Sequence, residues 1–217
     1  MALSNGFQKT MLMRISLTNA GKRFNRDWIF RKLSIQLNAG SSYAIIGPNG
    51  SGKSTLLQVL SGSMQESEGK CQWFSGDDEV LQENIYQSVS FCAPYFEVVE
   101  EMTLLEFFDF HQKFKSFIPG FDKYEIIKTI NLENARDKQI RYYSSGMKQR
   151  VKLAQCIFSD TPIVLLDEPC TNLDTAGIDL YHNLVNNYCK ERLVVVSSND
   201  EVEYGFCDQQ LLISDYK

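Results

Sequence analysis

The chain has 217 residues and a formal net charge of −5, because 27 acidic residues outnumber 22 basic ones. A chain of that length can bury a sizeable core without disulfides or metals. Its composition, with 43% hydrophobic and 23% charged residues, excludes a disordered or fibrous protein. An acidic chain is a poor candidate for sequence-independent nucleic-acid binding, which depends on Lys and Arg, so we expect no nucleic-acid partner.

No apolar run approaches the length that spans a bilayer, so we predict no direct insertion into a membrane. The six cysteines form no C-x-x-C pair, which favours reduced thiols in the cytoplasm. Residues 1–12 are expected to be a loose extension.

The first part of the chain has strand patterns around one helix. Strands are predicted where apolar residues alternate or run together, at 14–17, 29–37, 43–46, 71–74 and 89–92. The helix is predicted at 53–60, because its leucines recur on one face.

Helical patterns then replace buried-strand patterns. The first helix of this region is expected over 103–117, with Thr103 and Glu106 forming a T-x-x-E capping box. Phenylalanines recur in it at steps of three and four, which predicts one core-facing stripe. The stripe consists of Phe107, Phe110, Phe114 and Phe117. A second helix is expected at 124–130.

Helices and fully apolar strands alternate in the last part of the chain. Helices are predicted at 146–158 and 178–187, and strands at 163–166, 193–196 and 211–213. Fully apolar strands are typical of a parallel sheet that is covered on both faces. The alternation therefore predicts an α/β fold with a mainly parallel central sheet.

A glycine-rich segment lies between a predicted strand and a predicted helix and satisfies G-x-x-x-x-G-K-[ST]. Its glycines let backbone N–H groups turn toward phosphate oxygens, and the helix adds its positive end. Lys53 is expected to reach the β- and γ-phosphates of ATP, and the Ser54 hydroxyl to bind Mg²⁺. The predicted ATP-binding residues are Gly47, Pro48, Asn49, Gly50, Ser51, Gly52, Lys53, Ser54 and Thr55.

The apolar strand at 163–166 ends in two acids, Asp167 and Glu168. Ligands of parallel sheets bind at the carboxyl ends of the strands, so Asp167 is expected to hold Mg²⁺, through water. Glu168 is placed to polarise an attacking water as a general base. Paired with the phosphate loop, the two acids predict ATP hydrolysis.

Residues 143–150, YSSGMKQR, stand just before this strand. Together with the phosphate loop and the two acids, they resemble an ATP-binding cassette (ABC) ATPase, whose signature is usually LSGGQ followed by a basic, Gln-containing helix. The resemblance implies one P-loop NTPase domain with a mainly parallel central sheet, an N-terminal antiparallel β subdomain and a helical insertion. It places the core at 13–93 and 145–217 and the insertion at 94–144.

In that family two cassettes pair head-to-tail, and the signature of one closes on the ATP of the other. The resemblance assigns this contact in trans to Ser144, Ser145 and Gly146. Asp174, in a TNLD segment that resembles the family's D-loop, is expected at the dimer seam. Without the resemblance, Ser144 and Asp174 would be interpreted as ordinary helix caps.

The family also stacks adenine on an aromatic residue upstream of the phosphate loop. Phe24 is the first candidate for this role. Trp28 and Phe30 are rivals, and each of the three would serve equally as a core residue.

Two positions depart from the family pattern. Pro94 stands where a glutamine is expected, and its side chain can neither bind a metal nor donate a hydrogen bond. Asn199 replaces the switch histidine; it can donate to a phosphate but cannot be protonated.

The resemblance implies the ATPase subunit of an ABC transporter, which energises a separate transmembrane permease subunit. The catalytic residues would be Glu168, Lys53 and Asn199, with turnover slowed by Pro94 and Asn199. The chain would pair with itself or a paralogous cassette, on the cytoplasmic face of the inner or plasma membrane. Residues 94–102, which mix apolar and acidic side chains, would either dock the permease or form a solvated loop with a few buried anchors. Two alternatives stay open: a nucleotide-gated module with little ATPase activity, and a soluble ABC ATPase without a transport role.

Overall fold

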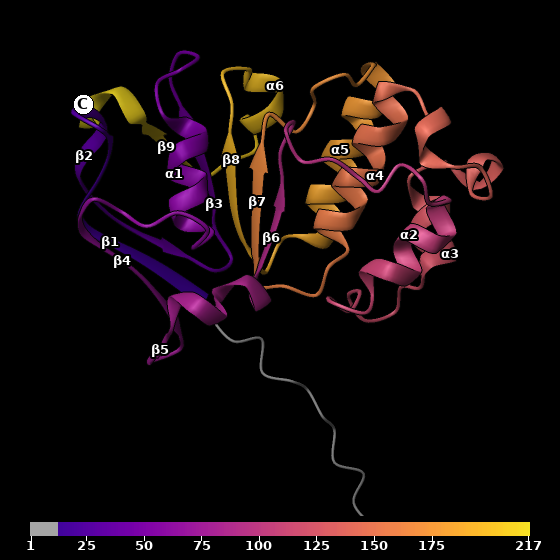
Figure 1. The fold of residues 1–217 in the computed structure, drawn as a ribbon, viewed down its shortest axis with the longest axis horizontal. Helices are drawn as coiled ribbons and strands as arrows, with labels where there is room; N and C mark the ends of the chain where they lie inside the picture. Colours follow the sequence, from indigo (N-terminus) through magenta and orange to yellow (C-terminus); the bar gives the residue numbers. More distant parts are fainter. Residues whose placement is uncertain (1–12) are drawn as a thin grey trace, which may run out of the picture.

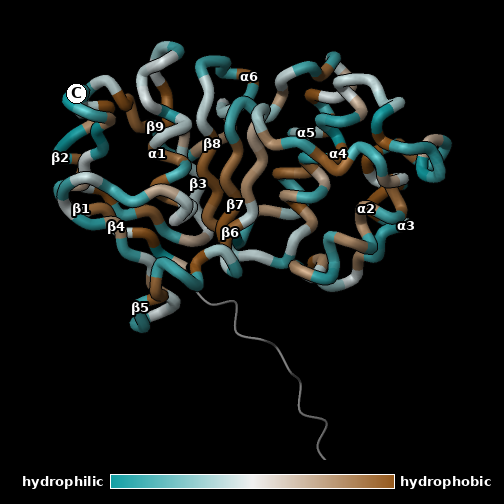
Figure 2. The backbone as a smooth tube through the Cα atoms, in the orientation of Figure 1, coloured by the Kyte–Doolittle hydropathy of each residue, from teal (hydrophilic) through white to brown (hydrophobic). Residues whose placement is uncertain are grey.

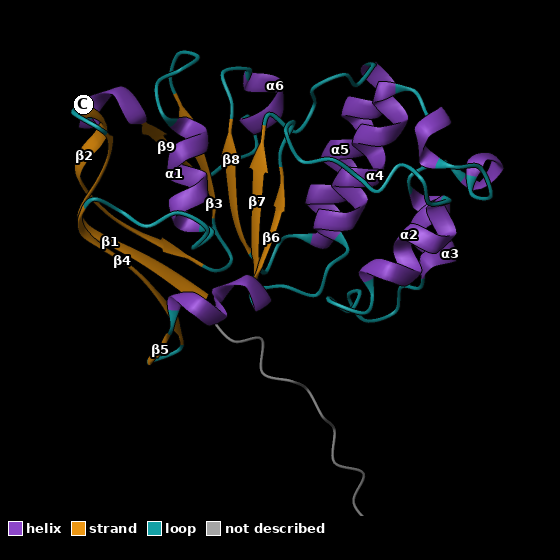
Figure 3. Ribbon diagram, viewed as in Figure 1, coloured by secondary structure: helices purple, strands orange, loops and turns teal. Residues whose placement is uncertain are grey.

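The computed structural model describes residues 13–217, so the predicted extension at 1–12 lies outside the described residues. Two sheets and a group of helices lie side by side (Figure 1 and Figure 3). An antiparallel sheet has the strand order β2-β1-β4-β5, and a parallel sheet has the order β6-β7-β8-β3-β9. The predicted α/β fold with a parallel central sheet is therefore confirmed.

β1 and β4 are longer than the strands predicted at 14–17 and 71–74, and the short strand β5 is not among those predicted. The other strands lie within two residues of their predicted bounds. The antiparallel sheet consists of β1 (Met13–Phe24), β2 (Asp27–Asn38), β4 (Glu68–Ser75) and β5 (Asp78–Val80). The parallel sheet consists of β3 (Ser42–Ile46), β6 (Val89–Cys92), β7 (Ile163–Asp167), β8 (Leu193–Ser197) and β9 (Gln209–Leu212).

The helices divide between the two faces of the parallel sheet. They are α1 (Lys53–Leu60), α2 (Leu104–His111), α3 (Lys123–Thr129), α4 (Ser145–Ile157), α5 (Thr175–Tyr188) and α6 (Glu201–Tyr204). Short 3₁₀ turns are η1 (Gln82–Gln87), η2 (Glu133–Ala135), η3 (Ile140–Tyr142) and η4 (Ile213–Tyr216). The region 94–144 contains α2, α3, η2 and η3.

Side chains of the parallel strands alternate between two cores. Ile163 and Leu165 pack with α1 and the antiparallel sheet, whereas Val164 and Leu166 pack with α2 to α5. Successive residues of a strand point to opposite faces, so a strand covered on both faces must be apolar throughout. Figure 2 shows the result as hydrophobic strands at the centre of the molecule.

The strand order brings three loops together at one edge of the parallel sheet. β8 lies between β7 and β3, and Ser197 at its end pairs with Asp167 on one side and Ile45 on the other. Parallel strands end at the same edge, so the loops after all three strands meet there (the upper edge in Figure 1).

The helix predicted over 103–117 begins as expected but ends at His111. The capping box of Thr103 and Glu106 is present. Beyond the helix, the chain turns to bond with the loop between α4 and β7: the Ile118 N–H donates to the Phe158 carbonyl at 2.9 Å. These contacts override the helical pattern.

The predicted core stripe is therefore wrong for two of its four phenylalanines. Phe107 and Phe117 are buried, but Phe110 is exposed and Phe114 is 72% exposed. The two exposed rings contact each other edge to face, with centroids 5.1 Å apart.

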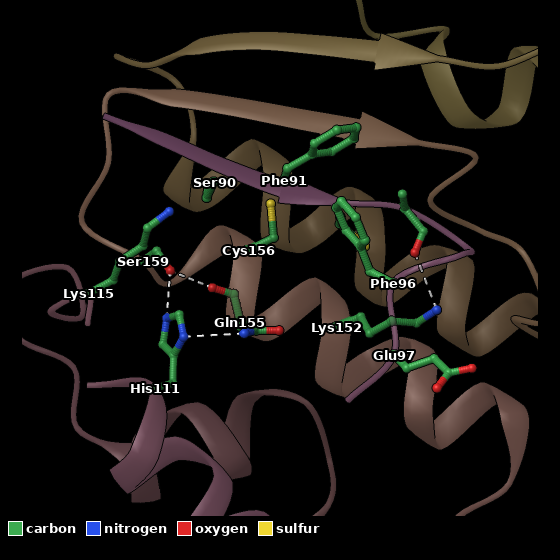
Figure 4. A pocket seen from close by; sticks show the side chains of 12 residues that line it. Ser90, Phe91, Phe96, Glu97, His111, Lys115, Lys152, Gln155, Cys156 and Ser159 are labelled. Carbon is green, nitrogen blue, oxygen red and sulfur yellow. Dashed lines mark hydrogen bonds between the residues drawn. The ribbon is translucent and has the colours of Figure 1, made fainter. Parts of the chain in front are cut away.

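His111, at the end of α2, lies in a cavity between α2, α4 and the edge strand β6 (Figure 4). Its Nε2 lies 2.8 Å from Ser159 Oγ, and its Nδ1 lies 3.3 Å from Gln155 Nε2. Burial, and then the nearby charge of Lys115, lower the pKa of His111 to about 4. The ring is therefore neutral in the folded protein at neutral pH.

This burial predicts a pH-dependent contribution to stability. The unfolded chain binds a proton at His111 below about pH 6.5, whereas the folded chain does so only below about 4. Between these values the unfolded state gains protons first, so stability is lost as the pH falls through this window. Urea unfolding at pH 7.5 and pH 5 should show a larger loss for the wild type than for His111→Gln. Equal losses in the two chains would contradict the assignment.

Candidate functional site

The glycine-rich loop joins β3 to α1 and requires glycine at specific positions. Gly47, Gly50 and Gly52 have positive φ, at 149°, 74° and 109°. A Cβ atom on Gly52 would lie 2.3 Å from Cγ2 of Ile29, and one on Gly47 would lie 2.8 Å from Cγ2 of Ile213. Gly52 is the residue at which α1 begins, so its backbone directs the helix N-terminus toward the loop.

Lys53 is held at the centre of this loop. Its Nζ donates hydrogen bonds to the carbonyls of Gly47 at 2.8 Å and Pro48 at 3.4 Å. The residue is only 5% exposed. Burial lowers the pKa of Lys53, and the charges of Glu168 and Asp167 oppose that shift. The ammonium therefore lies inside the loop, close to both acids.

Asn199 links this lysine to the loop. Its Oδ1 accepts a hydrogen bond from Lys53 Nζ at 3.1 Å, and its Nδ2 donates to Oδ1 of Asn49 at 2.6 Å. Asn199 follows β8, the strand adjacent to β3. Lys53, Asn199 and Asn49 thus bond to one another in this structure, whereas the Ser51 hydroxyl is buried without a hydrogen-bond partner among the described residues.

The two acids end the buried strand β7. Asp167 is 2% exposed, and its Oδ1 has no hydrogen-bond partner among the described residues. Glu168 has φ 42°, an uncommon value for a residue other than glycine, and its N–H donates to the Ser197 carbonyl at 2.9 Å. Glu168 also lines a hollow of about 220 Å³ with Lys53 and Ser54. The orphaned, buried carboxylate oxygen of Asp167 is the type of ligand that Mg²⁺ prefers.

Within residues 13–217, no three His, Cys, Asp or Glu side chains lie close enough to hold a metal on their own. A cation at Asp167 and Ser54 would therefore need further oxygen ligands from water or a nucleotide.

The signature segment contacts the D-loop segment rather than the phosphate loop of its own chain. Ser144 caps α4 by accepting a hydrogen bond from the Met147 N–H at 3.2 Å. A Cβ on Gly146 would lie 3.0 Å from the Asn172 carbonyl oxygen. The Asp174 carboxylate caps α5 by accepting a hydrogen bond from the Gly177 N–H at 2.8 Å. Ser144 and Asp174 therefore both act as ordinary helix caps within their own chain. Ser144, Ser145, Gly146 and Asp174 are all absent from the lining of the hollow beside Lys53.

The three aromatic candidates for adenine stacking differ in access. Phe30 is completely buried in the core. Trp28 is partly buried and lies under two guanidinium groups, those of Arg23 and Arg31, at 5.5 and 4.4 Å from its ring. Phe24, at the end of β1, is 46% exposed, and the Lys22 ammonium lies 5.4 Å from its ring centroid.

Pro94, where the family pattern has a glutamine, accepts a hydrogen bond at its backbone carbonyl. The donor is Lys152 Nζ, at 3.2 Å. The following residues are mixed: Tyr95, Phe96 and Val99 are exposed, whereas Val98 is buried.

Comparison with known proteins agrees with this geometry. Residues 30–171 match the family model described as ABC transporter. The chain belongs to the ABC transporter family. It is an ATP-binding ATPase subunit of that family, which energises transport through a separate membrane component.

Two relatives are similar over nearly their whole length. The uncharacterized ABC transporter ATP-binding protein YybJ of Bacillus subtilis is 29% identical over 202 residues, covering 89% of each chain. The cytochrome c biogenesis ATP-binding export protein CcmA of Haemophilus influenzae is 27% identical over 206 residues, covering 94% of this chain and 97% of the relative.

A dimeric bacterial ABC transporter cassette has the same fold, with a TM-score of 0.77 at 20% identity over 92% of this chain and 94% of the cassette. No helix among residues 13–217 has the length and apolar character needed to cross a bilayer.

The close approach of Gly52 to Ile29 predicts a sharp difference between two glycines. Both Gly50 and Gly52 have positive φ, but a Cβ on Gly50 meets nothing within 4 Å. Gly50→Ala should cost about 1–2 kcal/mol of stability. Gly52→Ala should cost more and also abolish nucleotide binding, because the loop must shift away from Ile29. Urea unfolding and a fluorescent-nucleotide assay measure both effects; equal costs would refute the packing argument.

Proposed function

We propose that this chain binds Mg-ATP at the carboxyl edge of its parallel sheet and hydrolyses it with Glu168 as general base. The observation that carries the proposal is the arrangement around Lys53. Its buried ammonium lies inside the loop, and the charges of Asp167, at the end of β7, and Glu168, directly after it, oppose the lowering of its pKa by burial. A phosphate chain is the ligand that would replace its present carbonyl and amide acceptors.

In this proposal the loop residues 47–55 surround the phosphates, and Lys53 contacts the β- and γ-phosphates. Ser54 and, through water, Asp167 would hold Mg²⁺, for which the unpartnered Asp167 oxygen is suited. The bound ion would neutralise charge that develops on the phosphates. Asn199 would exchange its contact with Lys53 for one to the γ-phosphate, since its amide can donate as well as accept.

Glu168 is proposed to take a proton from the attacking water. Its carboxylate lines the same hollow as Lys53 and Ser54. Its left-handed backbone is compatible with a strained catalytic position. The side chain thus supplies a base on the side where the γ-phosphate would lie.

The site is proposed to be completed by a second cassette. Ser144, Ser145 and Gly146 would approach the γ-phosphate held by the other chain, and Asp174 would lie at the seam. The distance of these residues from their own chain's hollow supports a role in trans. The partner is either a second copy or a paralogous cassette.

The membrane partner is proposed to be a transmembrane permease, with this chain peripheral on the cytoplasmic face of the inner or plasma membrane. The exposed Tyr95, Phe96 and Val99, in the loop before α2, supply an apolar surface for that contact.

Replacing Glu168 should separate chemistry from binding. Glu168→Gln keeps the shape but cannot accept a proton, so turnover should fall by about 10²–10⁴-fold while ATP affinity stays within about twofold. Steady-state phosphate release and equilibrium nucleotide binding measure the two. Glu133→Gln, at an exposed site on the insertion, is the matched control. Unchanged turnover in Glu168→Gln would reject the assigned role, whereas a parent chain that binds ATP without turning it over would favour a nucleotide-gated module.

Turnover is proposed to be slowed by Pro94 and Asn199. Restoring the family residues with Pro94→Gln and Asn199→His should raise kcat several-fold. Pro94→Gln adds a side chain that can bond near the phosphates, and Asn199→His adds one that can be protonated. The two single variants should each give part of the gain. A double variant no faster than the wild type would show that neither departure limits the rate.

Phe24 is proposed to stack on adenine. Phe24→Ala should weaken ATP binding by about 5- to 150-fold, the range for loss of one base–aromatic stack. Phe114→Ala, which removes another exposed ring, should leave ATP binding unchanged. Binding of inorganic triphosphate distinguishes stacking from a general defect, because it should not respond to Phe24→Ala. Equal losses for ATP and triphosphate would contradict the stacking role.

A further inference from the structure

One peptide unit in the loop after β7 is held from both sides. The Pro169 carbonyl accepts a hydrogen bond from Nε2 of Gln149 at 2.7 Å. The Cys170 N–H donates to Oε1 of Glu203, also at 2.7 Å. That carbonyl and that N–H belong to the same planar peptide unit. Gln149 lies on α4 and Glu203 on α6, so the unit joins two helices that are far apart in the sequence.

The held peptide unit lies between two segments of the proposed site. Glu168 precedes it directly, and the D-loop segment at 171–174 follows it. The backbone is left-handed on both sides of the unit, with φ 42° at Glu168 and 66° at Asn172, and such values are uncommon outside glycine. An uncommon backbone conformation persists where the surrounding structure holds it. The two side-chain hydrogen bonds are placed to hold this loop in its shape.

Glu203 projects from the short helix that follows Asn199. This helix, α6, lies near the ends of β7 and β8 at the upper edge of the parallel sheet (Figure 1). Asp200 caps it by accepting a hydrogen bond from the Val202 N–H at 3.0 Å. The Glu203 carbonyl accepts another from the Tyr181 hydroxyl of α5 at 2.8 Å. The carboxylate is therefore carried by a helix that is bonded to α5 and begins two residues after Asn199.

Glu203 is a buried acid without a cationic partner. It is 6% exposed, and none of the ion pairs among residues 13–217 includes it. Burial raises the pKa of Glu203, hydrogen bonds from Ser198 and the Cys170 N–H oppose this shift, and the charges of Glu168 and Asp200 add to it. An acid is costly at such a position. The acceptor that it offers to the Cys170 N–H gives this acid a positional role.

We propose that Glu203 is a positioning residue of the ATPase site, whose carboxyl oxygen fixes the Cys170 backbone and thereby the position of Glu168 and the D-loop segment. Gln149 holds the same peptide unit from the signature helix. The inference rests on the proposed function, in which Glu168 is the general base. It goes beyond that function because Glu203 does not line the hollow beside Lys53 and acts through the loop.

A conservative replacement separates this role from a merely structural one. Glu203→Gln keeps an oxygen that can accept from the Cys170 N–H, whereas Glu203→Leu removes the acceptor and keeps a side chain of similar size. Glu203→Leu should lower kcat about 10- to 100-fold, the effect of a misplaced catalytic group, and leave ATP affinity within about twofold. Glu203→Gln should keep kcat within about threefold of the wild type. Steady-state phosphate release and equilibrium nucleotide binding measure both effects.

Tyr181→Phe is the matched control for the packing of α6. It removes a buried hydrogen bond to the Glu203 carbonyl and leaves the bond between the Glu203 carboxylate and Cys170 in place. It should lower stability toward urea, while kcat stays within about twofold of the wild type. A loss of kcat as large as that of Glu203→Leu would overturn the proposal, because any disturbance of α6 would then be sufficient.

Hydrogen exchange of the Cys170 amide tests the bond itself. Exchange should be at least about tenfold faster in Glu203→Leu than in the wild type or Glu203→Gln, because the amide loses its acceptor. Gln149→Leu, which releases the other side of the unit, should also lower kcat. Combined with Glu203→Leu, its loss should be less than multiplicative, because both residues act through one peptide unit.

Three results would overturn the assignment to Glu203. They are full turnover in a folded Glu203→Leu chain, a Glu203→Gln chain as slow as Glu203→Leu, and unchanged exchange at Cys170. If Glu203→Leu does not fold, full turnover in Gln149→Leu would overturn the proposed hold on the loop. A parent chain without any ATP turnover would instead overturn the proposed function, and the exchange measurement would still decide whether Glu203 holds Cys170.

Discussion

The carboxyl edge of the parallel sheet is organised around one buried charge, the ammonium of Lys53. A buried ammonium is costly unless it is hydrogen-bonded or paired. Two carbonyls of the phosphate loop and the Asn199 amide supply the bonds, and Asp167 and Glu168 supply the opposite charge. These groups come from the ends of three strands, β3, β8 and β7, so the lysine is stable only where those strand ends meet.

That requirement explains why the strand order matters more than any single motif. β8 separates β3 from β7, which sets Asn199 between the phosphate loop and the two acids. A polyphosphate would satisfy Lys53 better than neutral carbonyls do, and it would release Asn199 from its bond to the lysine. On the proposed function, nucleotide binding would exchange the acceptors of Lys53 at a site that is already folded.

The parts of this site that local sequence encodes were predictable. α1 has the predicted bounds, because Gly52 and Lys53 fix its start and the leucine spacing fixes its face. Other features depend on contacts between distant segments. The end of α2 at His111 is set by bonds to the loop after α4, and the bond between Cys170 and Glu203 joins residues 33 positions apart. Periodicity carries no information about such pairs.

The central claim is that two chains complete one ATP site, and complementation tests it most directly. Lys53→Ala disables the phosphate loop, and Gly146→Asp disables the signature; each variant alone should be inactive. In a head-to-tail pair, the mixed dimer contains one intact site and one site that carries both substitutions. In an equal mixture about half of the dimers are mixed, and half of the sites in those dimers are intact. The mixture should therefore recover about a quarter of wild-type ATPase activity. A mixture as inactive as its components, beside an active wild type, would contradict the account.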